Sequence, residues 1–193
     1  MTEPLARPSR RDFLVRSAAV GGGLALGVPF VIDAQAAGGA SELTHWIVIQ
    51  PDNTVVIRIA RSELGQGSFT GLAQLVAEEL ECDWSDVRAE YADVNAHVKR
   101  NRVWGAMSTG GSRSIRESQE YLRQAGAAAR QMLVTAAARK WGVPPEECTV
   151  ALGMIAHTPT GRTTRFGDVA ADAAKLDVPK DVKLKDPSQW RVI

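Results

Sequence analysis

The chain has 193 residues, 45% hydrophobic and 23% charged, which is enough for one domain with its own core plus extensions. A formal net charge of +1, with arginine and lysine spread along the chain, excludes a protein that binds nucleic acid by neutralising phosphates. Two cysteines, Cys82 and Cys148, exclude a disulfide framework and a metal held by thiolates. We expect two separate buried thiols, and one disulfide remains open if the compartment is oxidising.

The first 36 residues have the pattern of an export signal. Ser9-Arg10-Arg11-Asp12-Phe13-Leu14 precedes a weakly hydrophobic, glycine-rich run at 18–32, and Ala34-Gln35-Ala36 follows as a small-residue cleavage site. Pro29 interrupts the run, which is shorter than the roughly 20 apolar residues that span a membrane as a helix. The paired arginines resemble the twin-arginine signal for folded proteins, so we expect a periplasmic location. The alternative is a basic start before an ordinary apolar segment.

Two β-branched runs, at 44–50 and 54–60, flank Pro51-Asp52-Asn53 and predict a hairpin. The second run leads into Gly65-Gln66-Gly67, and Ser68 follows where an N-cap would open a helix. The two glycines allow close approach of a bound group, and the helix start supplies N–H donors, so this first turn suits a phosphate or pyrophosphate. The alternative is a strand-to-helix turn with two conformational glycines.

The helix predicted over 69–80 is amphipathic. Its apolar face is expected to lie on a sheet and consists of Phe69, Leu72, Ala73, Leu75, Val76 and Leu80. Three glutamates, Glu78, Glu79 and Glu81, are expected to face water. A third strand is predicted at 87–94, and an irregular link follows at 95–107.

A second small-residue turn, 108–114, comes directly before the longest helical pattern in the chain. Gly110, Gly111, Ser112 and Ser114 offer backbone N–H groups and hydroxyls that suit another anion, although a flexible N-cap is the alternative. The helix is predicted over 115–141, where an alanine-rich face implies close packing and Gly142 ends the pattern.

The rest of the chain predicts short strands at 149–152, 154–158 and 162–166, and then a short helix at 167–176. Residues 177–193 are expected to be an extended linker to a further domain. We therefore predict a signal peptide at 1–36, one α+β domain at 37–176 and a tail at 177–193. The domain should contain a small, mostly antiparallel sheet with two main helices on one face.

Two blocks of sequence carry a resemblance to a known family. ELGQGSFTGLAQLVAEELECDW at 63–84 and TGGSRSIRESQEYLRQAGAAARQMLVTAAARKWGVPPEEC at 109–148 resemble the large, molybdenum-cofactor-binding subunit of the xanthine dehydrogenase and aldehyde oxidase family. Together with the twin-arginine start, they resemble most the exported type exemplified by the isoquinoline 1-oxidoreductase beta subunit. The resemblance covers residues 9–193, the N-terminal portion of that subunit.

The resemblance implies a cofactor and residues that bind it. In the family, both turns hold a molybdopterin dinucleotide, here expected to be molybdopterin cytosine dinucleotide, and the reaction hydroxylates an aldehyde or N-heterocycle. Gln66 would hydrogen-bond the cofactor, with close approach allowed by Gly65 and Gly67. The second turn would contact the pterin and its phosphates through Gly110, Gly111, Ser112 and Ser114.

The resemblance also implies that half of the site lies elsewhere. The family's catalytic glutamate, the glutamine near the metal's oxo ligand and a GGFGG-like segment match nothing here, so no catalytic residue and no metal ligand are assigned to this chain. Glu63 is expected to be structural, and His45, His97 and His157 to be surface or satisfied core histidines. Expected partners are the remaining large-subunit domains and a [2Fe–2S] small subunit. The alternative function is a non-catalytic exported module that binds a nucleotide-like ligand or a partner protein, or a truncated relic.

Overall fold

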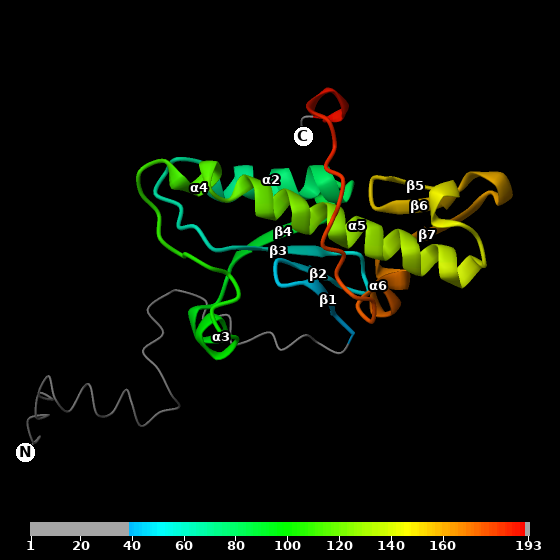
Figure 1. The fold of residues 1–193 in the computed structure, drawn as a ribbon, viewed down its shortest axis with the longest axis horizontal. Coiled ribbons are helices and arrows are strands. Elements are labelled where there is room, and N and C mark those ends of the chain that lie inside the picture. Colours follow the sequence, from blue (N-terminus) through cyan, green and yellow to red (C-terminus); the bar gives the residue numbers. More distant parts are fainter. Residues whose placement is uncertain (1–38, 192–193) are drawn as a thin grey trace, which may run out of the picture. The chain divides into compact units, whose positions relative to one another are not determined.

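The computed structural model describes residues 39–191, so the predicted export signal lies outside the described residues (Figure 1). A four-stranded sheet has the order β1-β2-β3-β4, with strands β1 (Ser41–Thr44), β2 (Ile47–Ile49), β3 (Val55–Ile59) and β4 (Val87–Tyr91). The first three strands are antiparallel, and β2 with β3 confirms the predicted hairpin. β4 instead pairs parallel to β3, which requires a crossover connection.

Helix α2 (Ser68–Leu80) forms that crossover, so the first turn lies at the carboxyl end of β3. In open sheets with parallel strands, ligands bind outside the carboxyl ends of the strands. The connection from β4 contains a short helix, α3 (Val94–Lys99), where the sequence predicted an irregular link.

The long predicted helix is divided in two. α4 (Arg113–Arg116) is a single turn, and α5 (Gln119–Trp141) is the longest helix of the described residues (Figure 1). The N–H of Ser118 donates to the carbonyl of Ile115, three residues back, at 3.1 Å. Such a bond tightens the chain and separates the two helices. The prediction of one continuous helix over 115–141 was therefore wrong.

A second sheet follows α5 and contains the three predicted strands. It is antiparallel in the order β5-β6-β7, with β5 (Cys148–Ala151), β6 (Met154–His157) and β7 (Arg162–Arg165). Helix α6 (Gly167–Ala173) follows β7 and is the last α-helix of the described residues. The described part also contains four short 3₁₀ turns, at Trp84–Asp86, Pro145–Glu147, Thr158–Thr160 and, in the tail, Pro187–Gln189. The α+β class is confirmed, with two small sheets in place of one.

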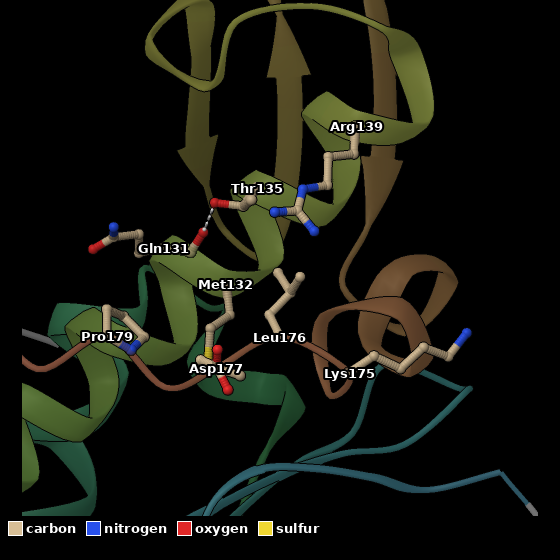
Figure 2. A pocket seen from close by; sticks show the side chains of 8 residues that line it. All are labelled: Gln131, Met132, Thr135, Arg139, Lys175, Leu176, Asp177 and Pro179. Carbon is tan, nitrogen blue, oxygen red and sulfur yellow. Dashed lines mark hydrogen bonds between the residues drawn. The ribbon is translucent and has the colours of Figure 1, made fainter.

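The tail after α6 contacts the two long helices (Figure 1). The residues after α6, together with α5, border an open cavity of about 330 Å³, lined by Gln131, Met132, Thr135, Arg139, Lys175, Leu176, Asp177 and Pro179 (Figure 2). Further along, the Lys185 ammonium pairs with Glu78, and the Lys185 N–H donates to Glu79 at 3.0 Å. The tail is therefore bound to the domain as far as the structure describes it, and a domain beyond it stays a prediction.

The glutamates of α2 correct one expectation. Glu79 is 0% exposed and Glu78 is 8% exposed, although the sequence placed both towards water. Arg123 of α5 donates to the Glu79 carboxylate from Nε at 2.9 Å, and the tail covers the same side of α2. A buried carboxylate is tolerated because it is paired and hydrogen-bonded.

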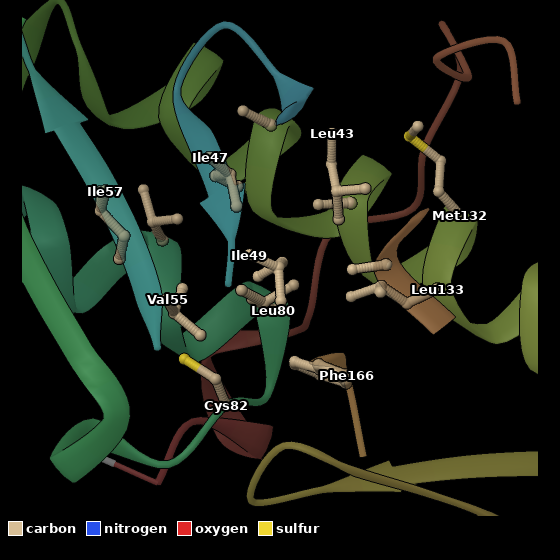
Figure 3. Packing of buried hydrophobic residues seen from close by; sticks show 14 of the residues in the cluster. Leu43, Ile47, Ile49, Val55, Ile57, Leu80, Cys82, Met132, Leu133 and Phe166 are labelled. Atoms are coloured by element: carbon tan, nitrogen blue, oxygen red, sulfur yellow. The ribbon is translucent and has the colours of Figure 1, made fainter. Parts of the chain in front are cut away.

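The core lies between the four-stranded sheet and helices α2 and α5 (Figure 3). Alternate residues of β2 and β3 meet the apolar faces of both helices, and the fully buried members include Ile47, Ile49, Ile57, Leu72, Leu80 and Leu133. The helices approach closely at Gly126, where an added Cβ would stand 2.7 Å from the carbonyl oxygen of Val76. This contact agrees with the close packing expected from the alanine-rich face.

Candidate functional site: two adjoining turns

The first turn leaves β3 and opens α2 with positive backbone angles at both glycines. Gly65 has φ of 96° and Gly67 has φ of 75°, and Gly67 is the N-cap in place of the predicted Ser68. Glycine adopts this left-handed region without the steric cost that a Cβ brings. Ser68 is the first helical residue and is buried.

The carboxylate of Glu63 caps the start of α2. It accepts hydrogen bonds from the N–H groups of Gly65 and Gly67, both at 2.8 Å, and of Phe69 at 2.9 Å. The bond from Phe69, followed by that from Gly67, holds the pKa of Glu63 below its ordinary value. The donors that the sequence offered to a phosphate are therefore taken by the chain's own carboxylate, which is a structural role for Glu63.

The Gln66 amide folds back on the same turn. Its Nε2 donates to the carbonyl of Ser62 at 3.0 Å and to Oγ of Ser68 at 2.6 Å, while Oε1 accepts from the N–H of Leu64 at 2.6 Å. A primary amide has two donors and two acceptor lone pairs. In this arrangement Gln66 has one lone pair left on Oε1 for a ligand.

The second turn is more open. Gly110, Gly111 and Ser112 are exposed, whereas Ser114 is buried. Gly111 and Ser112 both have φ of 57°, and the N–H of Arg113 donates to the carbonyl of Gly110 at 3.1 Å. Within residues 39–191, the N–H groups of Gly111 and Ser112 donate to no described residue. They remain available to an external acceptor.

The structure brings the two turns together. Oγ1 of Thr109 donates to the Ser62 carbonyl at 3.0 Å, the same oxygen that accepts from Gln66. Arg61, which the sequence reasoning did not assign, precedes the first turn and donates to the carbonyl of Ser108 at 2.6 Å. The sequence offered one indication of a role for Arg61, which is its position directly after a run of buried strand residues.

Two cavities of the described part of the chain lie away from the turns. One described cavity lies beside the tail (Figure 2), and another of about 270 Å³ is lined mainly by Ala77, Cys82, Trp84, Leu152 and Lys185. Neither is lined by residues 61–71 or 108–118. Small-molecule sites usually bury about 70–90% of their ligand. The two turns form one open wall, because their residues Gly65, Gln66, Gly67, Gly110, Gly111 and Ser112 are exposed.

The histidines agree with the sequence expectation. His45 is half exposed and lies 2.9 Å from an Arg100 nitrogen, while buried His97 accepts from the N–H of Trp104 at 3.3 Å. Buried His157 is placed between Glu147 at 2.8 Å and Thr160 at 2.7 Å. Among the described residues, no three His, Cys, Asp or Glu side chains are grouped to hold a metal ion.

Both cysteines are free thiols. Burial raises the pKa of Cys82 to about 12, which keeps this sulfur protonated and unreactive. Cys148 opens β5, an edge strand, and is only partly buried, so the expectation of two buried thiols was wrong for Cys148.

Comparison with known proteins identifies the domain. The family model "Molybdopterin cofactor-binding domain" matches residues 6–192. A membrane-bound aldehyde dehydrogenase of Gluconacetobacter polyoxogenes, whose name gives pyrroloquinoline quinone, is 39% identical over 96% of this chain and 24% of its own length. The isoquinoline 1-oxidoreductase subunit beta of Brevundimonas diminuta is 36% identical over 86% of this chain and 22% of its own.

A solved structure supports the fold. Quinoline 2-oxidoreductase from Pseudomonas putida 86 matches with a TM-score of 0.50 and 21% identity, over 66% of this chain and 16% of that one. The chain thus spans about a quarter of the length of the two curated relatives. No helix in the described part is long and apolar enough to cross a membrane. With its resemblance confirmed, the chain belongs to the molybdopterin cofactor-binding domain family of the xanthine dehydrogenase type.

Proposed function

We propose that the chain provides one wall of the site for a molybdopterin dinucleotide in the large subunit of an exported molybdenum hydroxylase. The observation that carries the proposal is the contact between two turns 47 residues apart, made where Thr109 donates to Ser62. The proposed contact residues are those of the two turns: Gly65, Gln66, Gly67, Gly110, Gly111, Ser112 and Ser114.

The geometry of the turns fits such a ligand. A Cβ added at Gly65, Gly67, Gly110 or Gly111 would meet no atom within 4 Å, so the backbone is accessible on that side. The free lone pair on Oε1 of Gln66 could accept a hydrogen bond from an N–H group of the ligand's neutral pterin ring. The N–H groups of Gly111 and Ser112, which donate to no described residue, could donate to phosphate oxygens. When bound, the molybdenum group supplies the redox chemistry of hydroxylation with oxygen from water.

The roles of this chain's residues in that reaction are to bind and to orient. Glu63 keeps a negative charge at the start of α2, which disfavours a phosphate there and favours the second turn for the phosphates. The wall is open, so further domains of the large subunit must enclose the ligand and exclude water.

The substrate and partners are proposed from the relatives. Their names specify an aldehyde and isoquinoline, which supports an aldehyde or an N-heterocycle as the substrate class here. The relative named as subunit beta supports assembly with other subunits, and we propose a [2Fe–2S] subunit as the electron acceptor. The signal-like residues 1–36 support a periplasmic location by the twin-arginine route.

The test is cofactor content in the assembled enzyme. The chain is produced with its genomic neighbours, and molybdenum is measured by elemental analysis in wild type, Gln66→Ala and Gly111→Asn. Asparagine tolerates positive φ, so the Gly111 variant places a side chain in the open space without breaking the turn.

Both variants should contain much less molybdenum than wild type, and Gln131→Ala, in the cavity beside the tail, should match wild type. Wild-type molybdenum content in Gln66→Ala and Gly111→Asn would refute the assignment of the turns.

A further inference from the structure

Arg61 is a buried charge placed between the two turns. It is 3% exposed, while Glu117, the carboxylate nearest to its guanidinium at 3.5 Å, has a side chain that is 42% exposed. An ion pair at that distance with a partly solvated partner contributes little. Burying the guanidinium is tolerated only because its N–H groups are hydrogen-bonded elsewhere.

The other contacts join Arg61 to both ends of one segment. NH1 donates to the carbonyl of Ser108 at 2.6 Å, at the first residue of the second turn, and Nε donates to Oγ of Ser118 at 2.9 Å, directly before α5. Residues 108–118 contain the second turn and α4. One side chain at the entry to the first turn therefore holds the second turn from both sides.

The shape of the guanidinium matters here. Its donors form a rigid planar fork, so two acceptors that lie apart can be satisfied together, which a lysine ammonium on a flexible stem cannot do in the same way. Ser118 is fully buried, so its hydroxyl has no water to replace Arg61. The hydrogen bond from Thr109 to Ser62, which also joins the turns, is exposed and competes with water.

We infer that Arg61 is the positioning residue that sets the spacing of the two turns before any ligand arrives. The inference rests on the proposed function for its role in binding, because a ligand that contacts both turns needs them at one fixed distance. Pre-ordering of the turns lowers the entropy that binding must overcome. Arg61 itself need not touch the ligand.

Hydrogen exchange of the full chain without cofactor tests the positioning directly. The variants are Arg61→Met, which keeps the length of the side chain without donors, and Arg61→Lys, which keeps the charge without the fork. Arg123→Met is the matched control, because Arg123 is also an arginine that joins separate segments, but it pairs with Glu79 at the C-terminal end of α2 and contacts the tail, not the turns.

In Arg61→Met and Arg61→Lys, the amides of Arg113, Glu117 and Ser118 should exchange about tenfold faster, while the amides within α5 keep wild-type rates. Arg123→Met should leave the amides of 108–118 unchanged. Wild-type exchange in Arg61→Met, or full recovery in Arg61→Lys, would overturn the inference.

Molybdenum content of the assembled enzyme gives the second readout. Arg61→Met should lower it several-fold, as Gln66→Ala does, whereas Arg123→Met should not. Faster exchange with unchanged molybdenum in Arg61→Met would also overturn the inference. A failure of the proposed function would give a different result. Gln66→Ala and Gly111→Asn would then keep the wild-type molybdenum content, whatever the exchange rates of residues 108–118 are.

Discussion

The contact between α2 and α5 at Gly126 leads to a quantitative prediction for Gly126→Ala. The new Cβ would stand 2.7 Å from the carbonyl oxygen of Val76, 3.0 Å from Cβ of Glu79 and 3.4 Å from the N of Leu80. Two of these atoms belong to the helix backbone, so no side-chain rotation relieves the overlap and the helices must separate by several tenths of an ångström.

The magnitude follows from two opposing effects. Overpacking costs about 1–3 kcal/mol, and the rigid backbone neighbours place this site in the upper half of that range. Replacing glycine by alanine inside a helix returns about 1 kcal/mol. The expected net loss is about 1–2 kcal/mol, and the melting temperature should fall by about 2–8 °C for a chain of this size.

Gly71→Ala is the matched control, because an added Cβ there meets only Cδ1 of Ile115 at 3.6 Å, an ordinary contact. This variant should gain about 1 kcal/mol from helix propensity alone. Urea titration followed by circular dichroism compares both variants with wild type at unchanged m-value. A Gly126→Ala protein as stable as wild type, or as stable as Gly71→Ala, would refute the packing argument.

Four further predictions concern the cap, the tail, the cofactor and export. Because the pKa of Glu63 is lowered in the folded chain, its stabilisation is complete above the ordinary value of 4.5 and is lost as pH falls through the lowered value. Urea titrations should therefore show Glu63→Gln less stable than wild type at pH 7, with a gap that closes in acid; a pH-independent gap would contradict the cap. Lys185→Met leaves Glu78 buried without its cation and should lower the unfolding free energy by about 3–5 kcal/mol in the same titration, and a loss below about 0.5 kcal/mol would count against the tail as a structural element. The chain purified alone should contain no molybdenum and should not oxidise aldehydes or N-heterocycles in a dye-linked assay, and stoichiometric metal with turnover would disprove the one-wall proposal. Replacing Arg10 and Arg11 by lysine should retain the protein in the cytoplasm on cell fractionation, and normal periplasmic accumulation would exclude the twin-arginine route.

Several features of this fold could be predicted because they depend on neighbours in the chain. The β-branched runs on either side of Pro51-Asp52-Asn53 form the hairpin β2–β3. The apolar spacing of Leu72, Val76 and Leu80 matches one buried face of α2. The glycines at 65 and 67 do adopt positive φ. Periodicity and glycine content are local properties, so they are readable before any contact is known.

The predictions from sequence were wrong about the environment of charged side chains. Glu79 was expected to face water, but it is buried because Arg123 and the tail residue Lys185, 106 positions away, supply its donors. Glu63 was recognised as structural, yet its three bonds to the start of α2 became visible only in the folded turn. A sequence pattern shows that a side chain is polar, but it does not show which distant group neutralises it.

The candidate site divides in the same way between sequence and structure. Each turn was found from its own small residues, and the family resemblance indicated that both bind one cofactor. Only the tertiary structure placed Thr109 against Ser62 and joined Arg61 to Ser108 and Ser118. It also divided the long predicted helix at Ser118. These contacts depend on the parallel pairing of β3 with β4 and on the packing of α2 against α5, which are set by the whole buried core and by no single stretch of sequence.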